Sequence, residues 1–173
     1  MTDQLLPFAS RPYFIFLGLV LFSRGMDFLS TWVATPNLAL EGNPFAKWMG
    51  WRGGLIFNVA FSFALALWPL PAIMVCAMSL LVAARNFQSA WMMRSMGEAA
   101  YSVFMHERLM AAHPALFLVC IGAQSLLTGL VGFALMYVTD ERSIAFAIGS
   151  GVLGYAVAVI FFSALSLWRI RRR

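Results

Sequence analysis

The stretch ALFLVCIGAQSLLTGLVGFALMYVTDERSIAFAIGSGVLGYAVAVIFFSALSLW, residues 115–168, decides the class of fold. It contains two long apolar runs, at about 115–138 and 144–168, and its only charged residues lie between them at positions 140–142. A helix needs about 20 apolar residues to cross the hydrocarbon core of a bilayer, and each run is long enough. The stretch therefore predicts two membrane-spanning helices, joined by a tight polar loop into an antiparallel hairpin.

The composition of the whole chain agrees with this interpretation. Of 173 residues, 62% are hydrophobic and 11% are charged, whereas a soluble domain is roughly 45–50% apolar and about 25% charged. The composition excludes an ordinary soluble enzyme and a disordered chain. Cys76 and Cys120 both lie inside apolar runs, without the spacing of a disulfide scaffold or a metal site. We expect one integral membrane domain over residues 1–173.

Three further apolar runs precede the hairpin, at about 12–34, 55–68 and 72–93. Lipid admits only helices or closed barrels as spanning structures, and no run shows the alternation of a strand. The sequence therefore predicts an all-α polytopic transmembrane helical bundle. It has five spans, or four if the short run at 55–68 is a re-entrant segment. We expect the first run to be a retained span rather than a removable signal peptide, because no basic residue precedes it within residues 1–10.

Helix-breaking residues set the expected boundaries. Pro12 suits a helix start, and Thr35-Pro36-Asn37 ends the first span. Gly53-Gly54 is expected to break the chain before the second span, although the segment from Pro44 is an alternative continuation of that span. Residues 68–71 predict an uncharged turn. The segment 94–114 predicts an amphipathic cytoplasmic connection, with a polar linker at about 106–114.

The basic residues predict the orientation of the five spans. With the N-terminus outside, only Arg11 and Arg142 lie on the outer side. The inner side then holds nine basic residues: Lys47, Arg52, Arg85, Arg94, Arg108, Arg169, Arg171, Arg172 and Arg173. Cytoplasmic loops carry the excess of Lys and Arg, so we expect an N-out, C-in topology. No aromatic residues interleave the C-terminal arginines as a nucleic-acid platform requires, so we expect them to contact anionic lipid headgroups.

Small residues at helical spacing predict where helices pack closely. Such stripes allow close approach of helix backbones, within one chain or between subunits. The last two spans carry one stripe each, formed by Gly122, Ser125, Gly129, Ser150, Gly154 and Ala158. The third span carries another, formed by Ala72, Cys76, Ser79, Ala83, Asn86 and Ala90. The partners expected are the lipid bilayer and either other protein subunits or a second copy of the chain.

The polar residues around the first span are the strongest candidates for chemistry. Asp27 and Thr31 share one helix face, and Arg24 precedes Asp27 by one turn. An ionisable residue inside a span is costly and is a functional hypothesis by default. Here a structural Arg24–Asp27 ion pair is the favoured interpretation, and a functional carboxylate is the alternative. Asn43 followed by Pro44 is typical of a helix start, which leaves Glu41 without a structural explanation. The candidate catalytic residues are Asp27, Thr31, Glu41 and Asn43.

Other polar residues allow weaker hypotheses. His106 and His113 are the only histidines, and their spacing of seven does not match the zincin pattern, so they are weak candidates for metal ligands. Four arginines are candidates for ion pairs or lipid headgroup contacts: Arg24, Arg52, Arg85 and Arg94. The sequence indicates no particular cofactor.

The spacing Asp27-x3-Thr31, followed by Glu41-x-Asn43-Pro44, resembles a pattern found in uncharacterised small bacterial membrane proteins. In those proteins an Asp and a Thr on the first helix precede a Glu-x-Asn-Pro turn. The resemblance covers about the first 50 residues. It implies a multi-span helical protein of the bacterial inner membrane and carries no established activity.

Two functions of different classes follow from these observations. The first is a non-catalytic membrane protein that acts by packing, as an accessory subunit of a larger assembly or as a small homo-oligomer. The second is a membrane-embedded enzyme, or a lipid- or ion-handling protein, that uses Asp27 and Glu41 on the cytoplasmic side. No phosphate-binding loop or nucleophile motif is present to support the second.

Overall fold

The computed structural model describes residues 5–171, and the secondary structure of these residues is entirely helical. Four helices, α1, α3, α5 and α6, are long and apolar enough to span a membrane, which confirms the predicted all-helical membrane fold. The helices are α1 (Arg11–Ala34), α2 (Pro44–Leu65), α3 (Pro69–Met96), α4 (Glu98–Ala111), α5 (Pro114–Tyr137) and α6 (Ile144–Arg171).

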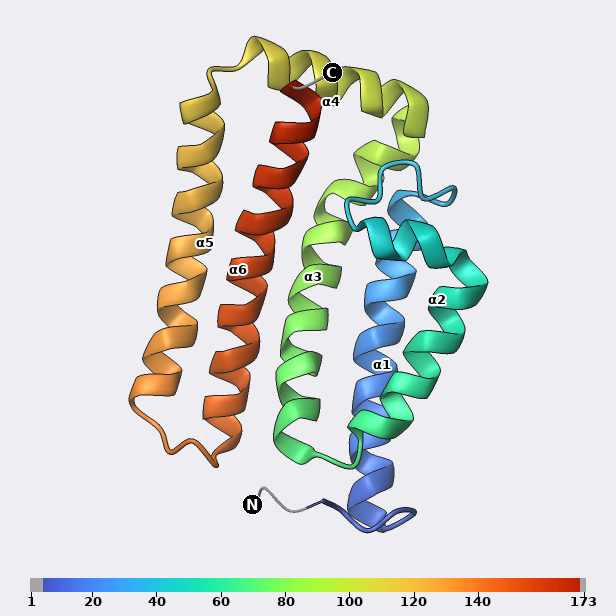
Figure 1. Ribbon diagram of the computed structural model, residues 1–173, viewed down its shortest axis with the longest axis vertical. Helices are drawn as coiled ribbons and strands as arrows, with labels where there is room; N and C mark the ends of the chain where they lie inside the picture. The colour runs from blue at the N-terminus through green and yellow to red at the C-terminus, as the bar shows by residue number, and fades with distance from the viewer. Residues whose placement is uncertain (1–4, 172–173) are drawn as a thin grey trace.

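The long helices lie side by side in the order α5, α6, α3 and α1, and α2 packs obliquely on α1 (Figure 1). α1, α3 and α6 run in one direction, whereas α2 and α5 run back. α4 crosses the end of the row at which α1, α3 and α6 finish (Figure 1). The arrangement is an open row, in which α5 packs mainly on α6 and forms one edge.

Side-chain caps explain where three of the helices begin. Ser10 Oγ accepts a hydrogen bond from Tyr13 N, Asn43 Oδ1 from Phe45 N, and His113 Nδ1 from Ala115 N. Each cap satisfies an otherwise unpaired backbone amide of a first helical turn. A proline that needs no amide partner stands in the same first turn each time. The predicted helix start at Asn43-Pro44 is confirmed.

The second apolar segment differs from its predicted bounds of 55–68. α2 begins at Pro44 and is kinked at Gly50, whose φ of 62° lies in the left-handed region that favours glycine. The expected break at Gly53-Gly54 is wrong, because both residues are helical. Gly54 instead allows α2 to approach α1, since a Cβ at this position would lie 3.4 Å from the Phe28 ring. Glycine thus allows a close helix contact at Gly54 and a kink at Gly50.

The third span is longer than predicted at both ends. α3 begins at Pro69, inside the expected turn at 68–71, because prolines are tolerated in a first helical turn. It continues to Met96, and Gly97, with a φ of 80°, then separates it from α4. The polar linker expected at 106–114 is also wrong in its first part, since residues 106–111 belong to α4.

Contacts at the start of α1 show that α2 runs back along it. The Tyr13 hydroxyl donates to the Phe63 carbonyl at 3.2 Å, and Leu6 N donates to Leu67 O at 2.9 Å. Around these bonds lies the main core cluster, formed by Tyr13, Phe16, Leu17, Val20, Leu65, Ala66 and Ala72. The end of α2 is therefore fixed at the level where α1 begins.

Glycine contacts hold the other helices together. A Cβ on Gly132 of α5 would lie 2.7 Å from Gly149 O of α6, and a Cβ on Gly149 would lie 2.6 Å from Gly132 O. Gly151 packs in the same way against Met74 and Ala77 of α3. The predicted α5–α6 hairpin is confirmed, and glycine is required at its closest contacts because any side chain would separate the backbones.

Candidate functional site

Arg24 is the centre of a polar cluster that connects the first three helices. Its Nε donates to Asn58 Oδ1 of α2 at 2.7 Å, and its Nη1 donates to Ser79 Oγ of α3 at 3.1 Å. The same Nη1 forms the ion pair with Asp27 Oδ2 at 3.0 Å. The Arg24 and Asp27 side chains are only 25% and 20% exposed. One guanidinium therefore holds α1, α2 and α3 together, as its five fixed donors permit.

Asn58 is held in one orientation by hydrogen bonds at both ends of its amide. Its Oδ1 accepts from Arg24, and its Nδ2 donates to Gly54 O at 2.7 Å. Ser62 donates to the Asn58 carbonyl of its own helix at 2.7 Å. Asn58 alone provides the polar contact from α2 to Arg24.

A second polar contact joins α1 and α3 one turn beyond the ion pair. Asn86 Nδ2 lies 3.2 Å from Ser30 Oγ and 3.3 Å from Thr31 Oγ1, and donates to both. The two hydroxyls donate in turn to the Asp27 carbonyl, at 2.8 and 3.0 Å. Thr31, a candidate catalytic residue, thus has its hydroxyl engaged as both donor and acceptor. The face of α3 that carries Asn86 is the predicted small-residue stripe, and it packs on α1.

The remaining candidates lie in the loop between α1 and α2. Glu41 Oε1 accepts from Asn43 N at 2.7 Å, and Asn43 caps α2. The Glu41 carboxylate lies close enough to Asp27 for their negative charges to repel each other. The structure thus brings Asp27, Thr31 and Glu41 to one end of α1, while the Asn43 side chain is occupied as a helix cap.

Glu98, at the start of α4, holds the same loop from outside the membrane helices. Its Oε1 accepts from Thr35 Oγ1 at 3.0 Å and from Asn37 N at 2.8 Å. Partial burial alone raises the pKa of Glu98, but the hydrogen bonds from Asn37, Thr35 and Ala39 outweigh it and lower the pKa. No local pattern identified this contact, because its partners lie more than 60 residues apart in sequence.

The arginines proposed for ion pairs or headgroups have different surroundings. Arg24 forms the ion pair described above, and Arg52 is exposed on α2. The Arg94 guanidinium lies 5.8 Å from the centre of the Trp32 ring, within cation–π distance. Arg85 Nη1 is buried and has no hydrogen-bond partner among residues 5–171. Arg85 is therefore the one of these four with a buried, unpaired nitrogen in the described part of the chain.

The histidines do not come together into a metal site. His106 is exposed on α4, whereas His113 is occupied as the cap of α5. Within residues 5–171, no three side chains of His, Cys, Asp or Glu converge as metal ligands would. The two histidines lie on different elements, because α4 ends at Ala111 and His113 precedes α5.

The small residues proposed for association lie partly inside the molecule. Ser125 and Gly129 are buried in the contact between α5 and α6, and Gly154 lies 3.7 Å, measured from an added Cβ, from Met78 Sδ of α3. An added Cβ on Gly122 would meet nothing within 4 Å, so this position faces outward. Ser150 donates to a carbonyl of its own helix at 2.9 Å, and Ala158 is partly buried.

Comparison with known proteins adds no family to this geometry. No protein-family model matches the chain, and no curated protein or solved structure is significantly similar to it.

Proposed function

We propose that the chain is a non-catalytic membrane protein that acts by packing, either as an accessory subunit of a membrane assembly or as a small homo-oligomer. The observation that carries this proposal is the use of the candidate polar side chains: Arg24, Asp27, Thr31 and Asn43 each form at least one hydrogen bond within the chain. Two surface hollows of the described residues, one along α6 and one between the α1–α2 loop and α4, are not lined by Asp27 or Thr31. The open edge formed by α5 provides a free apolar helix for a partner subunit or a second copy.

We further propose that the chain crosses the bacterial inner membrane five times, with its N-terminus outside and its C-terminus in the cytoplasm. The contacts of α2 support the fifth crossing. Trp51 Nε1 donates to Pro36 O at 2.7 Å beyond the end of α1, and Phe63 accepts from Tyr13 at the start of α1. Because α1 and α3 run in the same direction, the segment between them has to return through the bilayer. A membrane-impermeant thiol reagent on intact spheroplasts should label Arg142→Cys and leave Arg108→Cys unlabelled; the opposite result rejects this orientation.

Native mass measurement after mild detergent extraction tests the packing function. We expect the protein to be recovered with partner subunits or as an oligomer, and recovery as a lone monomer argues against this function. The competing hypothesis, an enzyme or a lipid- or ion-handling protein that uses Asp27 and Glu41, is favoured only by the proximity of the two carboxylates. If Glu41→Gln folds normally and loses the cellular phenotype, with Glu107→Gln on α4 as the control, the competing hypothesis gains and ours fails.

A further inference from the structure

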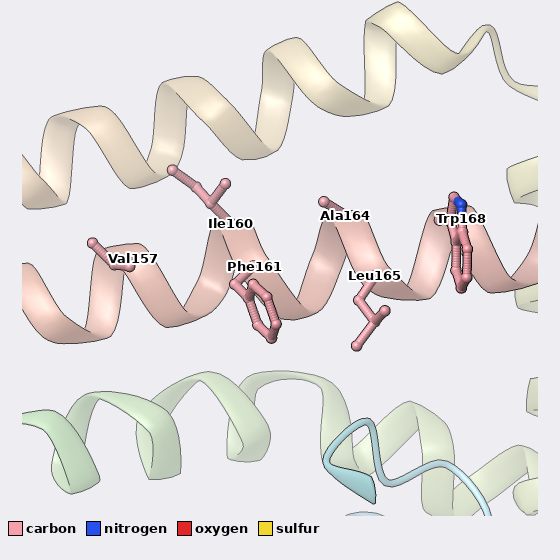
Figure 2. A pocket seen from close by; sticks show the side chains of 6 residues that line it. All are labelled: Val157, Ile160, Phe161, Ala164, Leu165 and Trp168. Carbon is pink, nitrogen blue, oxygen red and sulfur yellow. The ribbon is translucent and has the colours of Figure 1, made fainter.

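The C-terminal half of α6 carries an apolar groove of about 520 Å³. Figure 2 shows Ile160 directed toward α5, and Phe161 and Leu165 directed toward α3. The six residues that line the groove follow one another at helical spacing on one face of α6: Val157, Ile160, Phe161, Ala164, Leu165 and Trp168. The groove is therefore one continuous apolar stripe, flanked by two other helices.

The length of this stripe matches one leaflet of a bilayer. Eleven residues separate Val157 from Trp168, which at about 1.5 Å per residue gives about 16 Å along the helix. The hydrocarbon core of a bilayer is about 30 Å thick, so that one leaflet is about 15 Å deep. The stripe ends at Trp168, a residue type that is enriched at the membrane–water interface. An acyl chain of one leaflet thus has the same extent as the groove.

Positive charge begins where the apolar stripe ends. Arg171 continues the same face of α6, three residues beyond Trp168, and Arg169 is its neighbour. Both side chains are exposed, and Arg171 Nη2 donates to Ala112 O at 3.2 Å. This contact holds the Arg171 side chain across the upper end of the α5–α6 pair, at the depth of the headgroups. The apolar groove therefore ends in two cationic side chains.

Arg85 of α3 lies deeper along the bundle than Arg169 and Arg171. Gly154 of α6 packs against Met78 of α3, and the two helices run in the same direction. Arg85 follows Met78 by seven residues, as Phe161 follows Gly154, so Arg85 lies on the face of α3 toward α6 at about the level of Phe161. Its Nη1 is buried without a hydrogen-bond partner in residues 5–171. Arg85 therefore lies about ten residues, or roughly 15 Å, before the level of Arg171 and does not belong to the cationic end of the stripe.

We propose that this groove binds one anionic phospholipid, with an acyl chain along Val157–Trp168 and its phosphate at Arg171. An apolar helix of a partner would fit the stripe, but it would not compensate Arg169 and Arg171 at its end. An anionic headgroup at Arg171 does so. The inference is independent of the packing function, because a monomer can hold the lipid equally well.

Native mass spectrometry of the full chain, titrated with phosphatidylglycerol or with phosphatidylcholine of the same acyl chains, tests the proposal. We expect one phosphatidylglycerol to be retained about tenfold more tightly than phosphatidylcholine. Ala164→Trp fills the groove and should weaken the binding of both lipids at least fivefold. Arg171→Gln should weaken only the binding of phosphatidylglycerol. The matched controls are Ala123→Trp, on the exposed face of α5, and Arg52→Gln, exposed on α2, and neither should change the binding of either lipid.

Three results would overturn the proposal. Equal affinities for the two lipids would remove the role of the arginines. Unchanged lipid binding by Ala164→Trp would place the lipid outside the groove, provided that this variant elutes as the wild-type protein does on gel filtration. If Ala164→Trp changed the ratio of monomer to dimer and left lipid binding unchanged, a second copy of the chain would be the occupant. Because Arg171 is exposed, Arg171→Gln keeps the test decisive even if the groove variant fails to fold.

Discussion

Replacing Arg24 by Met should weaken the contacts between the first three helices, because Met is long and unbranched like Arg but forms none of its hydrogen bonds. The substitution removes three hydrogen bonds, to Asn58, Ser79 and Asp27. At about 0.6 kcal/mol for an average polar contact between membrane helices, their loss costs about 2 kcal/mol. Removing one partner of a buried ion pair costs about 3–5 kcal/mol. Since both side chains keep some exposure, we expect the free energy of unfolding to fall by about 3 kcal/mol.

Reversible unfolding in mixed micelles measures this change, and the double variant Arg24→Met with Asp27→Asn isolates the ion pair. We expect the double variant to be more stable than Arg24→Met alone, because it no longer contains an unpaired carboxylate. Arg52→Met removes the same charge from an exposed position of α2, and should change the free energy of unfolding by less than about 0.5 kcal/mol. The reasoning is refuted if Arg24→Met is as stable as Arg52→Met, or if the effects of the two substitutions in the double variant simply add.

Three further predictions test other contacts. Gly151→Leu should push α6 away from α3 and lower the free energy of unfolding by about 1–3 kcal/mol. Gly122→Ala, at an open helical position, should leave the free energy of unfolding unchanged or raise it slightly. Equal stabilities of the two variants would contradict the close contact of Gly151 with α3. Because the pKa of Glu98 is lowered in the folded state, the stability that it contributes is present above its ordinary pKa of 4.5 and is lost as the pH falls through the lowered value. The hydrogen-exchange protection factor of the Asn37 amide should fall over this range, and Glu98→Gln should reduce it already at pH 7; a protection factor independent of both changes would exclude the contact. Arg85→Leu should raise the free energy of unfolding in lipid-free detergent by about 1–2 kcal/mol, since it removes a buried unpaired nitrogen. A decrease in the same unfolding assay would show that Arg85 has a partner within the folded chain.

Local sequence patterns predicted most of the helices, because hydropathy and helix capping act over a few neighbouring residues. The apolar runs located α1, α3, α5 and α6. Asn43-Pro44 marked the start of α2 through a cap that needs only the next two residues. The predicted helix boundaries were wrong where one residue type has two structural roles. Glycine breaks α2 at Gly50 and allows close packing at Gly54, and only the position of α1 distinguishes the two.

The candidate site was predictable in part for the same reason. The ion pair between Arg24 and Asp27 joins residues one turn apart, so helical periodicity is enough to find it. The bonds from Arg24 to Asn58 and Ser79 join residues 34 and 55 positions apart. Which distant side chains meet depends on how the helices rotate and approach one another, and this is decided by packing over the whole molecule. The sequence by itself determined that the chain is a set of membrane helices with polar residues on the first of them, and only the tertiary structure decided that those residues hold three helices together.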